Sequence, residues 1–276
     1  MYKAMRMKVS KELERIPGFE VASHRLDGWW WLVAAVIGLV TLLATLRPDP
    51  YWRIIRFVSD GLVITVGVTL IAFVLTLFAG LIAALGRLSK IGFIRSITTI
   101  YVEIARGIPL LVQLLFWYFA FPSLIQSIGR LLQYRPFERY LANPFAMAIL
   151  GLTFCYAAYL SEVYRAGIQS IPKGQNEAAR SLGMTHGQAM RYIILPQAVR
   201  VILPPVGNEF ISLLKDSSLV SIVAVADMTR RGREFMAANF IPVETWIMIA
   251  LLYLIMTLIS ARVVAWIERK TQTEDR

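Results

Sequence analysis

Residues 61–86 read GLVITVGVTLIAFVLTLFAGLIAALG, a stretch without a single charged side chain. A helix rises 1.5 Å per residue, so about 20 apolar residues are enough to cross the hydrocarbon core of a bilayer, which is about 30 Å thick. This stretch exceeds that length. It therefore predicts a transmembrane helix, and the rest of the chain is interpreted outward from it.

The composition of the whole chain points the same way. Of its 276 residues, 57% are hydrophobic and 17% are charged, yet the formal net charge is +11. A nucleic-acid-binding protein would gather its Lys and Arg in stripes within a polar chain, whereas here the apolar residues form long blocks. This argues against a soluble globular enzyme, a disordered chain and a nucleic-acid partner. With one cysteine, Cys155, and two histidines, His24 and His186, neither a disulfide framework nor a metal site is expected.

Five further segments are predicted to cross the membrane as helices. They are residues 29–46, about 97–121, 145–160, 202–226 and 243–267. The segment 29–46 is longer than the apolar core of a signal peptide, and RPDP follows it instead of a cleavage site, so we expect an uncleaved anchor. Five tryptophans are expected to form a belt at the membrane interface: Trp29, Trp30, Trp31, Trp52 and Trp266.

The basic residues predict the orientation of these six spans. If the N-terminus is cytoplasmic, 17 Lys and Arg lie on its side of the membrane, nine lie on the other side, and Arg106, Lys215 and Arg262 lie within spans. Lys and Arg are enriched on the cytoplasmic side. Both ends, a segment at 1–28 and a tail at 269–276, are therefore expected in the cytoplasm.

The interval between the fourth and fifth spans carries residues that divide it into two short helices. Asn176 is expected to cap a helix over 177–182, with Glu177 near its positive N-terminal end. A second helix over 188–195 is expected to stop at Pro196. The other turn residues are Pro172, Gly174 and Gly183. From this pattern alone, an ordinary interfacial hairpin remains an alternative.

This hairpin also carries a known signature. Glu177-Ala178-Ala179, then Gly183, then Ile193-x-Leu195-Pro196 match EAA-x3-G-x9-I-x-LP at every defined position. That is the EAA loop of permease subunits of bacterial ABC importers. Over residues 52–268 the chain resembles the polar amino acid permease family, which includes the histidine and glutamine permeases. The resemblance extends through residues 106–118, 158–175 and 196–219, with Ser217 where threonine is common.

The resemblance implies an all-α polytopic membrane protein with the type I ABC importer permease fold. Five core transmembrane helices would form a permease domain at 52–268, and residues 29–46 would add one N-terminal helix. The EAA loop, at about 167–197, would dock on a cytoplasmic ATP-binding subunit. The residues expected to couple the two are Glu177, Ala178, Ala179, Gly183, Leu195 and Pro196.

The resemblance also implies partners. Two ATP-binding subunits, a second permease that is identical or similar, and an external amino-acid-binding protein would complete the importer in the bacterial inner membrane. The chain has no GxxxxGK[ST] phosphate loop, and no glycine is followed by lysine. We therefore expect no enzyme activity and no cofactor in this chain, with ATP and magnesium bound by the partner subunit.

The 202–226 span carries polar residues that are candidates for the substrate pathway: Asn208, Glu209, Ser212, Lys215 and Asp216. Glu209, Ser212 and Asp216 fall on one helical face. Ionisable groups inside a membrane normally face a water-filled cavity or pair with one another, so the alternative is that Lys215 simply pairs with a neighbouring carboxylate. Pro204 and Pro205 are expected to interrupt this span.

Two opposite-charge pairs are spaced i, i+3 on predicted helices. Glu103 and Arg106 are expected to neutralise each other near Pro109, which is expected to kink the third span. Glu162 and Arg165 lie close to the EAA loop and are candidates for a gate or hinge.

Two other functions remain open at this point. The first is a secondary amino acid transporter driven by an ion gradient, with Glu209, Lys215 and Asp216 as an ion relay. The lack of an evident internal repeat argues against it. The second, a scaffold or receptor without transport, leaves the polar face of the fifth span unexplained. Neither the transported amino acid nor the identity of the second permease follows from the sequence.

Overall fold

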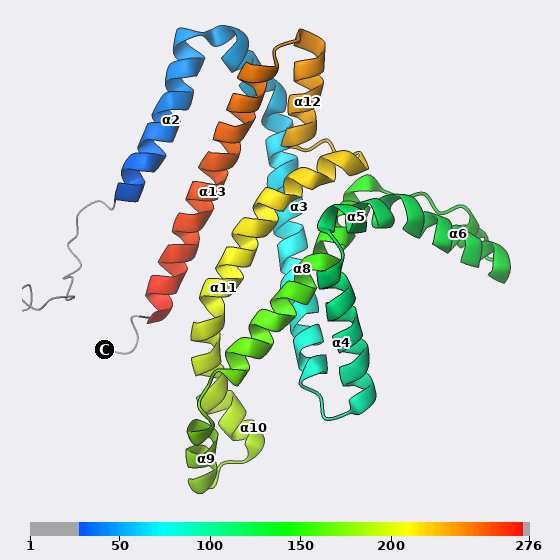
Figure 1. Cartoon of the computed structure of the whole chain (residues 1–276), viewed down its shortest axis with the longest axis vertical. Coiled ribbons are helices and arrows are strands. Elements are labelled where there is room, and N and C mark those ends of the chain that lie inside the picture. Colours follow the sequence, from blue (N-terminus) through cyan, green and yellow to red (C-terminus); the bar gives the residue numbers. More distant parts are fainter. Residues whose placement is uncertain (1–27, 273–276) are drawn as a thin grey trace, which may run out of the picture.

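The computed structural model describes residues 28–272, which fold into helices joined by short connections (Figure 1). The N-terminal segment and the last residues of the tail, 1–27 and 273–276, lie outside the described residues. Successive long helices run in opposite directions along the bundle (Figure 1). The long helices are α2 (Gly28–Leu46), α3 (Pro48–Arg87), α4 (Gly92–Gly107), α8 (Pro144–Gln169), α11 (Leu195–Asp216) and α13 (Pro242–Gln272). Each predicted span therefore has a helical counterpart.

Shorter helices lie between the long ones in the chain. They are α5 (Leu110–Leu115), α6 (Phe121–Leu132), α7 (Arg135–Glu138), α9 (Lys173–Ser181), α10 (His186–Ala189) and α12 (Met228–Asn239). Of these, α5 and α6 project to one side of the bundle (Figure 1). Five helical segments of the described chain are long and apolar enough to cross a membrane: 28–46, 48–87, 110–132, 144–169 and 242–271. The polar residues of α11 keep its hydropathy below that of these segments, as the sequence predicts for the fifth span.

The third predicted span, 97–121, is not one continuous helix. α4 ends at Gly107, Ile108 is extended, and α5 begins at Leu110. Pro109 has no N–H, so the Ala105 carbonyl loses its helical partner. The buried Gln113 side chain compensates, because its Nε2 donates to the carbonyls of Ala105 and Ile108 at 2.8 Å each. The expected kink is thus a complete break in the helix, and the Gln113 side chain supplies the hydrogen bonds that the two carbonyls would otherwise lack.

The core lies where α3 packs along α8, with α5 and α11 closing around them. Its fully buried side chains include Val68, Leu114, Leu152 and Leu213. Large apolar side chains on the outer faces, such as Phe78 and Ile82 of α3, remain exposed. Such faces are typical of helices that meet lipid.

The additional helix α2 packs on α13. Val33 and Val36 are buried against Leu258, and the Arg262 guanidinium lies 5.3 Å from the ring centres of both Trp29 and Trp30. All five tryptophans of the predicted belt are exposed. α2 is therefore attached to the bundle through a narrow stripe.

The fifth span differs from expectation at its prolines and its end. Pro204 and Pro205 lie inside α11, which continues through both, so the predicted interruption is wrong. Each proline removes one helical hydrogen bond, a loss that a helix packed against neighbours tolerates. The α-helix ends at Asp216, and a 3₁₀ turn follows at Ser217–Val223.

Helix α12 is fastened to α3 at the end of the bundle opposite α9 and α10 (Figure 1). The buried Asp227 caps α12, its carboxylate accepting from the N–H groups of Thr229 and Arg230 at 3.1 and 3.0 Å. Arg231 donates to Asp60 of α3 through Nε at 3.0 Å. Arg231 also bonds Glu234, and this bond holds the pKa of Glu234 below its usual range. Fixed polar contacts thus join the two helices.

The close approach of α3 and α12 requires a glycine. A Cβ at Gly61 would lie 2.8 Å from the carbonyl oxygen of Asp227, whereas a Cβ at Gly67, also inside α3, would meet nothing within 4 Å. We expect Gly61→Ala to destabilise the protein by about 1–3 kcal/mol through overpacking. Gly67→Ala should be neutral or stabilising by up to about 1 kcal/mol, because alanine favours helix. Thermal unfolding of the purified protein in detergent measures both, and equal melting temperatures would contradict the packing argument.

Candidate functional site

Helices α9 and α10 form a hairpin at one end of the bundle (Figure 1). α9 begins at Lys173 instead of the expected residue 177, because Pro172 occupies the position before it with the φ of −55° that its ring imposes. Asn176 therefore lies inside the helix and does not cap it. Glu177 falls in the second turn, away from the positive end, so its expected position at the N-terminus is wrong.

The turn of the hairpin depends on Gly183, whose φ is +79°. Here the Met184 N–H donates to the Ala179 carbonyl at 3.1 Å, which closes the end of α9. Thr185 then caps α10 in a capping box with Gln188. The second helix does not stop at Pro196. A π-helical turn at Met190–Ile194 leads directly into α11 and absorbs the irregularity before the proline.

The expected coupling residues divide into two groups. Ala179 is 3% exposed and faces the interior of the hairpin, so its small size serves the packing of α9 on the π-helical turn. The others lie at the surface: Glu177, Ala178, Gly183, Leu195 and Pro196. Leu182, which the sequence did not single out, is 80% exposed beside them.

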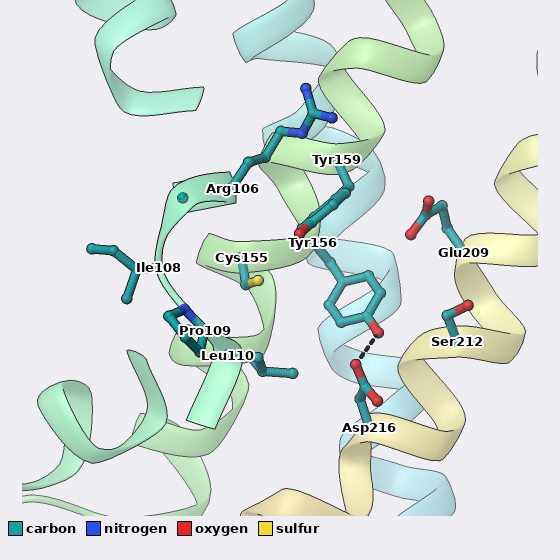
Figure 2. Close-up of a pocket in the computed structure, with 11 residues that line it drawn as sticks. Arg106, Ile108, Pro109, Leu110, Cys155, Tyr156, Tyr159, Glu209, Ser212 and Asp216 are labelled. Atoms are coloured by element: carbon teal, nitrogen blue, oxygen red, sulfur yellow. Dashed lines mark hydrogen bonds between the residues drawn. The ribbon is translucent and has the colours of Figure 1, made fainter. Parts of the chain in front are cut away.

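A cavity of about 480 Å³ opens between the end of α4, the middle of α8 and the C-terminal half of α11 (Figure 2). It brings together three of the predicted pathway residues, Glu209, Ser212 and Asp216, on its α11 wall. The opposite walls carry Arg106 and three side chains of α8: Cys155, Tyr156 and Tyr159. The break at Ile108–Pro109 forms part of the lining, so the opened backbone borders the cavity.

Two contacts order the polar groups of the cavity. The Tyr156 hydroxyl donates to an Asp216 carboxylate oxygen at 2.7 Å, linking α8 to α11. The Arg106 guanidinium lies over the Tyr159 ring, 5.4 Å from its centre. In the part of the chain that the structure describes, no ion pair joins Arg106 to Glu103, so their expected pairing is wrong. Arg106 therefore lines the cavity. The cavity thus has a cation on its α4 wall and two carboxylates, those of Glu209 and Asp216, on its α11 wall.

Asn208 and Lys215, the other two predicted pathway residues, do not line this cavity. Both are exposed on a different face of α11. Across residues 28–272, no ion pair connects Lys215 with Glu209 or Asp216, so the alternative of a pairing within the span is not observed. The described residues likewise hold no group of three or more His, Cys, Asp or Glu side chains that could bind a metal ion.

Glu162 and Arg165 form the ion pair that their spacing predicts, and a third residue joins them. The Glu162 carboxylate also accepts from Arg87 at the end of α3. Arg165 further donates to Gln169 at 2.5 Å. The sequence could not reveal Arg87, since it lies 75 residues away in the chain. The cluster ties α3 to α8 close to the hairpin.

Sequence reasoning missed the two tyrosines of the cavity. Tyr156 and Tyr159 stand at i, i+3 in an apolar span, and Glu162 follows Tyr159 at the same spacing, so each is a neighbour of the next on the surface of α8. Polar tips at that spacing inside a membrane helix are the signal that could have identified them, because a buried hydroxyl needs a partner.

Comparisons with known proteins identify the family of the chain and its fold. Residues 76–273 match the family described as the binding-protein-dependent transport system inner membrane component. The glutamine transport system permease protein GlnP of Escherichia coli (strain K12) is 33% identical over 219 residues, which cover 79% of this chain and 94% of GlnP. The L-cystine transport system permease protein TcyB of Bacillus subtilis (strain 168) is 37% identical over 221 residues, covering 80% and 87%.

A solved structure, that of an amino acid ABC transporter with histidines, matches with a TM-score of 0.69 and 38% identity, covering 83% of this chain and 98% of that one. The fold is therefore the all-α permease fold implied by the sequence, with α2 as the additional N-terminal helix. The chain belongs to the family of binding-protein-dependent transport system inner membrane components, the membrane permeases of ABC transporters.

Proposed function

We propose that the chain forms the translocation pathway of an ABC importer for polar or charged amino acids and couples it to a separate ATPase through the α9–α10 hairpin. The observation that carries this proposal is the cavity with opposed charges inside a membrane-spanning bundle. Similarity to permeases of glutamine and L-cystine transport systems supports the substrate class.

The charges of the cavity suit the backbone groups that all amino acids share. Arginine binds carboxylates through paired hydrogen bonds, and Arg106 can offer such a partner to the α-carboxylate. Glu209 and Asp216 on the facing wall can accept from the α-ammonium group. Since both charges of the substrate are then matched, the cavity would take a zwitterion at little electrostatic cost.

The exposed face of α11 supports a second permease, identical or similar, as a partner. Asn208 and Lys215 lie seven residues apart on this face, in a helix that packs against α8 and α13. An ammonium group facing lipid is costly, so this face is better explained by another subunit or by a shared aqueous path. The cavity would then be one half of the pathway.

The hairpin is suited to dock on an ATP-binding subunit. Glu177 and Ala178 of α9, with Leu182 directly after it, expose one acidic and two apolar side chains, and capping at both ends of the turn keeps the hairpin rigid. Two ATPase subunits, with ATP and magnesium, would move the two hairpins as they close. This shifts the permeases between inward-open and outward-open states only if ATP binding favours one state strongly.

The rest of the complex follows from this assignment. The hairpin and both ends of the chain would lie in the cytoplasm, as the basic residues predict, and an external amino-acid-binding protein would deliver substrate at the α12 end. Glu162 and Arg165, tied to Arg87, would act as a hinge that keeps α3 and α8 together during the switch. An ion relay in a secondary transporter is less well supported, because Lys215 lies outside the cavity.

Reconstitution with the partner subunits tests the function. Uptake of labelled glutamine, arginine or cystine into vesicles should require ATP and the ATP-binding subunits, and uptake that persists without them would favour a secondary transporter. Glu209→Gln should raise the KM of uptake roughly tenfold or more, since a hydrogen bond to a charged group contributes about 1.5–3 kcal/mol. Glu103→Gln makes the same change on an exposed site of α4 outside the cavity and should leave the KM unchanged.

The hairpin is tested by two alanine substitutions. An added Cβ meets nothing within 4 Å at Gly183 or at Gly187, but only Gly183 has a positive φ. The left-handed conformation costs an alanine about 1–2 kcal/mol, so Gly183→Ala should lower substrate-stimulated ATP hydrolysis roughly 5- to 30-fold while the subunit still inserts and folds. A bulkier residue should abolish transport. Normal stimulated hydrolysis in Gly183→Ala, or an equal loss in Gly187→Ala, would refute the role of the turn.

A further inference from the structure

A second hollow, of about 420 Å³, lies next to the cavity. Both are lined by the same three residues, Arg106, Tyr159 and Glu209. Along α8 the first cavity uses residues before Tyr159 and the second uses residues after it, toward the hairpin. Along α11, the first uses residues after Glu209 and the second uses residues before it. The two hollows are therefore stacked along the bundle axis and meet at these three side chains.

Together the two hollows follow much of the thickness of a bilayer. They extend along α11 from Val201 to Asp216, which at 1.5 Å per residue is about 22 Å. The hydrocarbon core is about 30 Å thick. The three side chains where the hollows meet therefore lie part-way along this length of the subunit.

One contact lies where the two hollows meet, that of the Arg106 guanidinium over the Tyr159 ring (Figure 2). Arg106 reaches the Tyr159 ring from the end of α4, while Glu209 lies across from them on α11. The position of Arg106 is fixed by the backbone break, whose Ala105 and Ile108 carbonyls are held by the Gln113 amide. The backbone of Arg106 is therefore held in place, while its long side chain can still change conformation.

The strength of this contact fits a gate that opens during transport. A cation over an aromatic ring contributes about 0.5–2 kcal/mol, whereas paired charge-assisted hydrogen bonds from a guanidinium to a carboxylate are stronger. An amino acid in the first cavity can therefore draw Arg106 away from the ring with its carboxylate. The cluster of Arg87, Glu162 and Arg165 lies on the hairpin side. Glu162 is bound there by two arginines and is therefore less free to move than Arg106.

We propose that Arg106 and Tyr159 form the gate between the two hollows and that the substrate carboxylate opens it. This inference rests on the proposed function, because it needs an amino acid as substrate. The Tyr159 ring holds the Arg106 guanidinium in the closed position. The same guanidinium binds the substrate carboxylate when the gate opens.

The test uses the complete transporter in vesicles loaded with whichever of labelled glutamine, arginine or cystine the wild-type complex takes up best. Without ATP, the wild type should retain the label. Tyr159→Leu should release it about fivefold faster, the factor that corresponds to a lost cation–π contact of about 1 kcal/mol, and Tyr159→Phe, which keeps the ring, should restore retention. Arg106→Gln should raise both the efflux rate and the KM of uptake.

Trp266→Leu is the matched control. It removes an exposed aromatic ring that lies 5.3 Å from the Lys270 ammonium, outside both hollows, and should retain label like the wild type. Retention by Tyr159→Leu and Arg106→Gln equal to the wild type, in complexes that still take up substrate with ATP, would overturn the gate alone. A wild-type complex that takes up none of the three amino acids would overturn the proposed function and the gate with it.

Discussion

Inside a bilayer, each polar group must bond to a protein partner or face water, and this constraint organises the structure around the Ile108–Pro109 break. The proline opens the backbone, and the Gln113 amide seals the two carbonyls that would otherwise be orphaned. Because this partner is a side chain of α5, the chain can change direction with both carbonyls paired. That change places Arg106 at the edge of a cavity, opposite the carboxylates of α11.

The same constraint explains which features could be predicted. Long uncharged segments such as 61–86 are stable in lipid as transmembrane helices, so the spans and their order follow from hydropathy. The exposed turn of the hairpin follows from Gly183, since few other residues adopt its φ. The signature around Glu177 identified the family, which the comparisons confirm.

What could not be predicted depends on contacts between distant segments. Arg106 pairs with Tyr159 of another helix instead of Glu103 three residues away, because α4 ends there and its last turn points toward α8. Arg87 joins the Glu162–Arg165 pair only once α3 packs along α8. Likewise, Pro204 and Pro205 resemble helix breakers in sequence, yet neighbouring helices support α11 through both. The local sequence pattern thus predicts where the helices lie, whereas the packing of the helices determines which side chains contact one another.

The π-helical turn at Met190–Ile194 has a mechanical consequence. Because it joins α10 to α11 without a loop, the hairpin and α11 form one continuous lever. Glu209 lies 14 residues beyond Leu195, so the arm is about 21 Å long, and roughly 3° of tilt at the hairpin displaces Glu209 by about 1 Å. A small rotation of the hairpin would therefore reach a carboxylate at the middle of the subunit through helix alone, with no intervening loop.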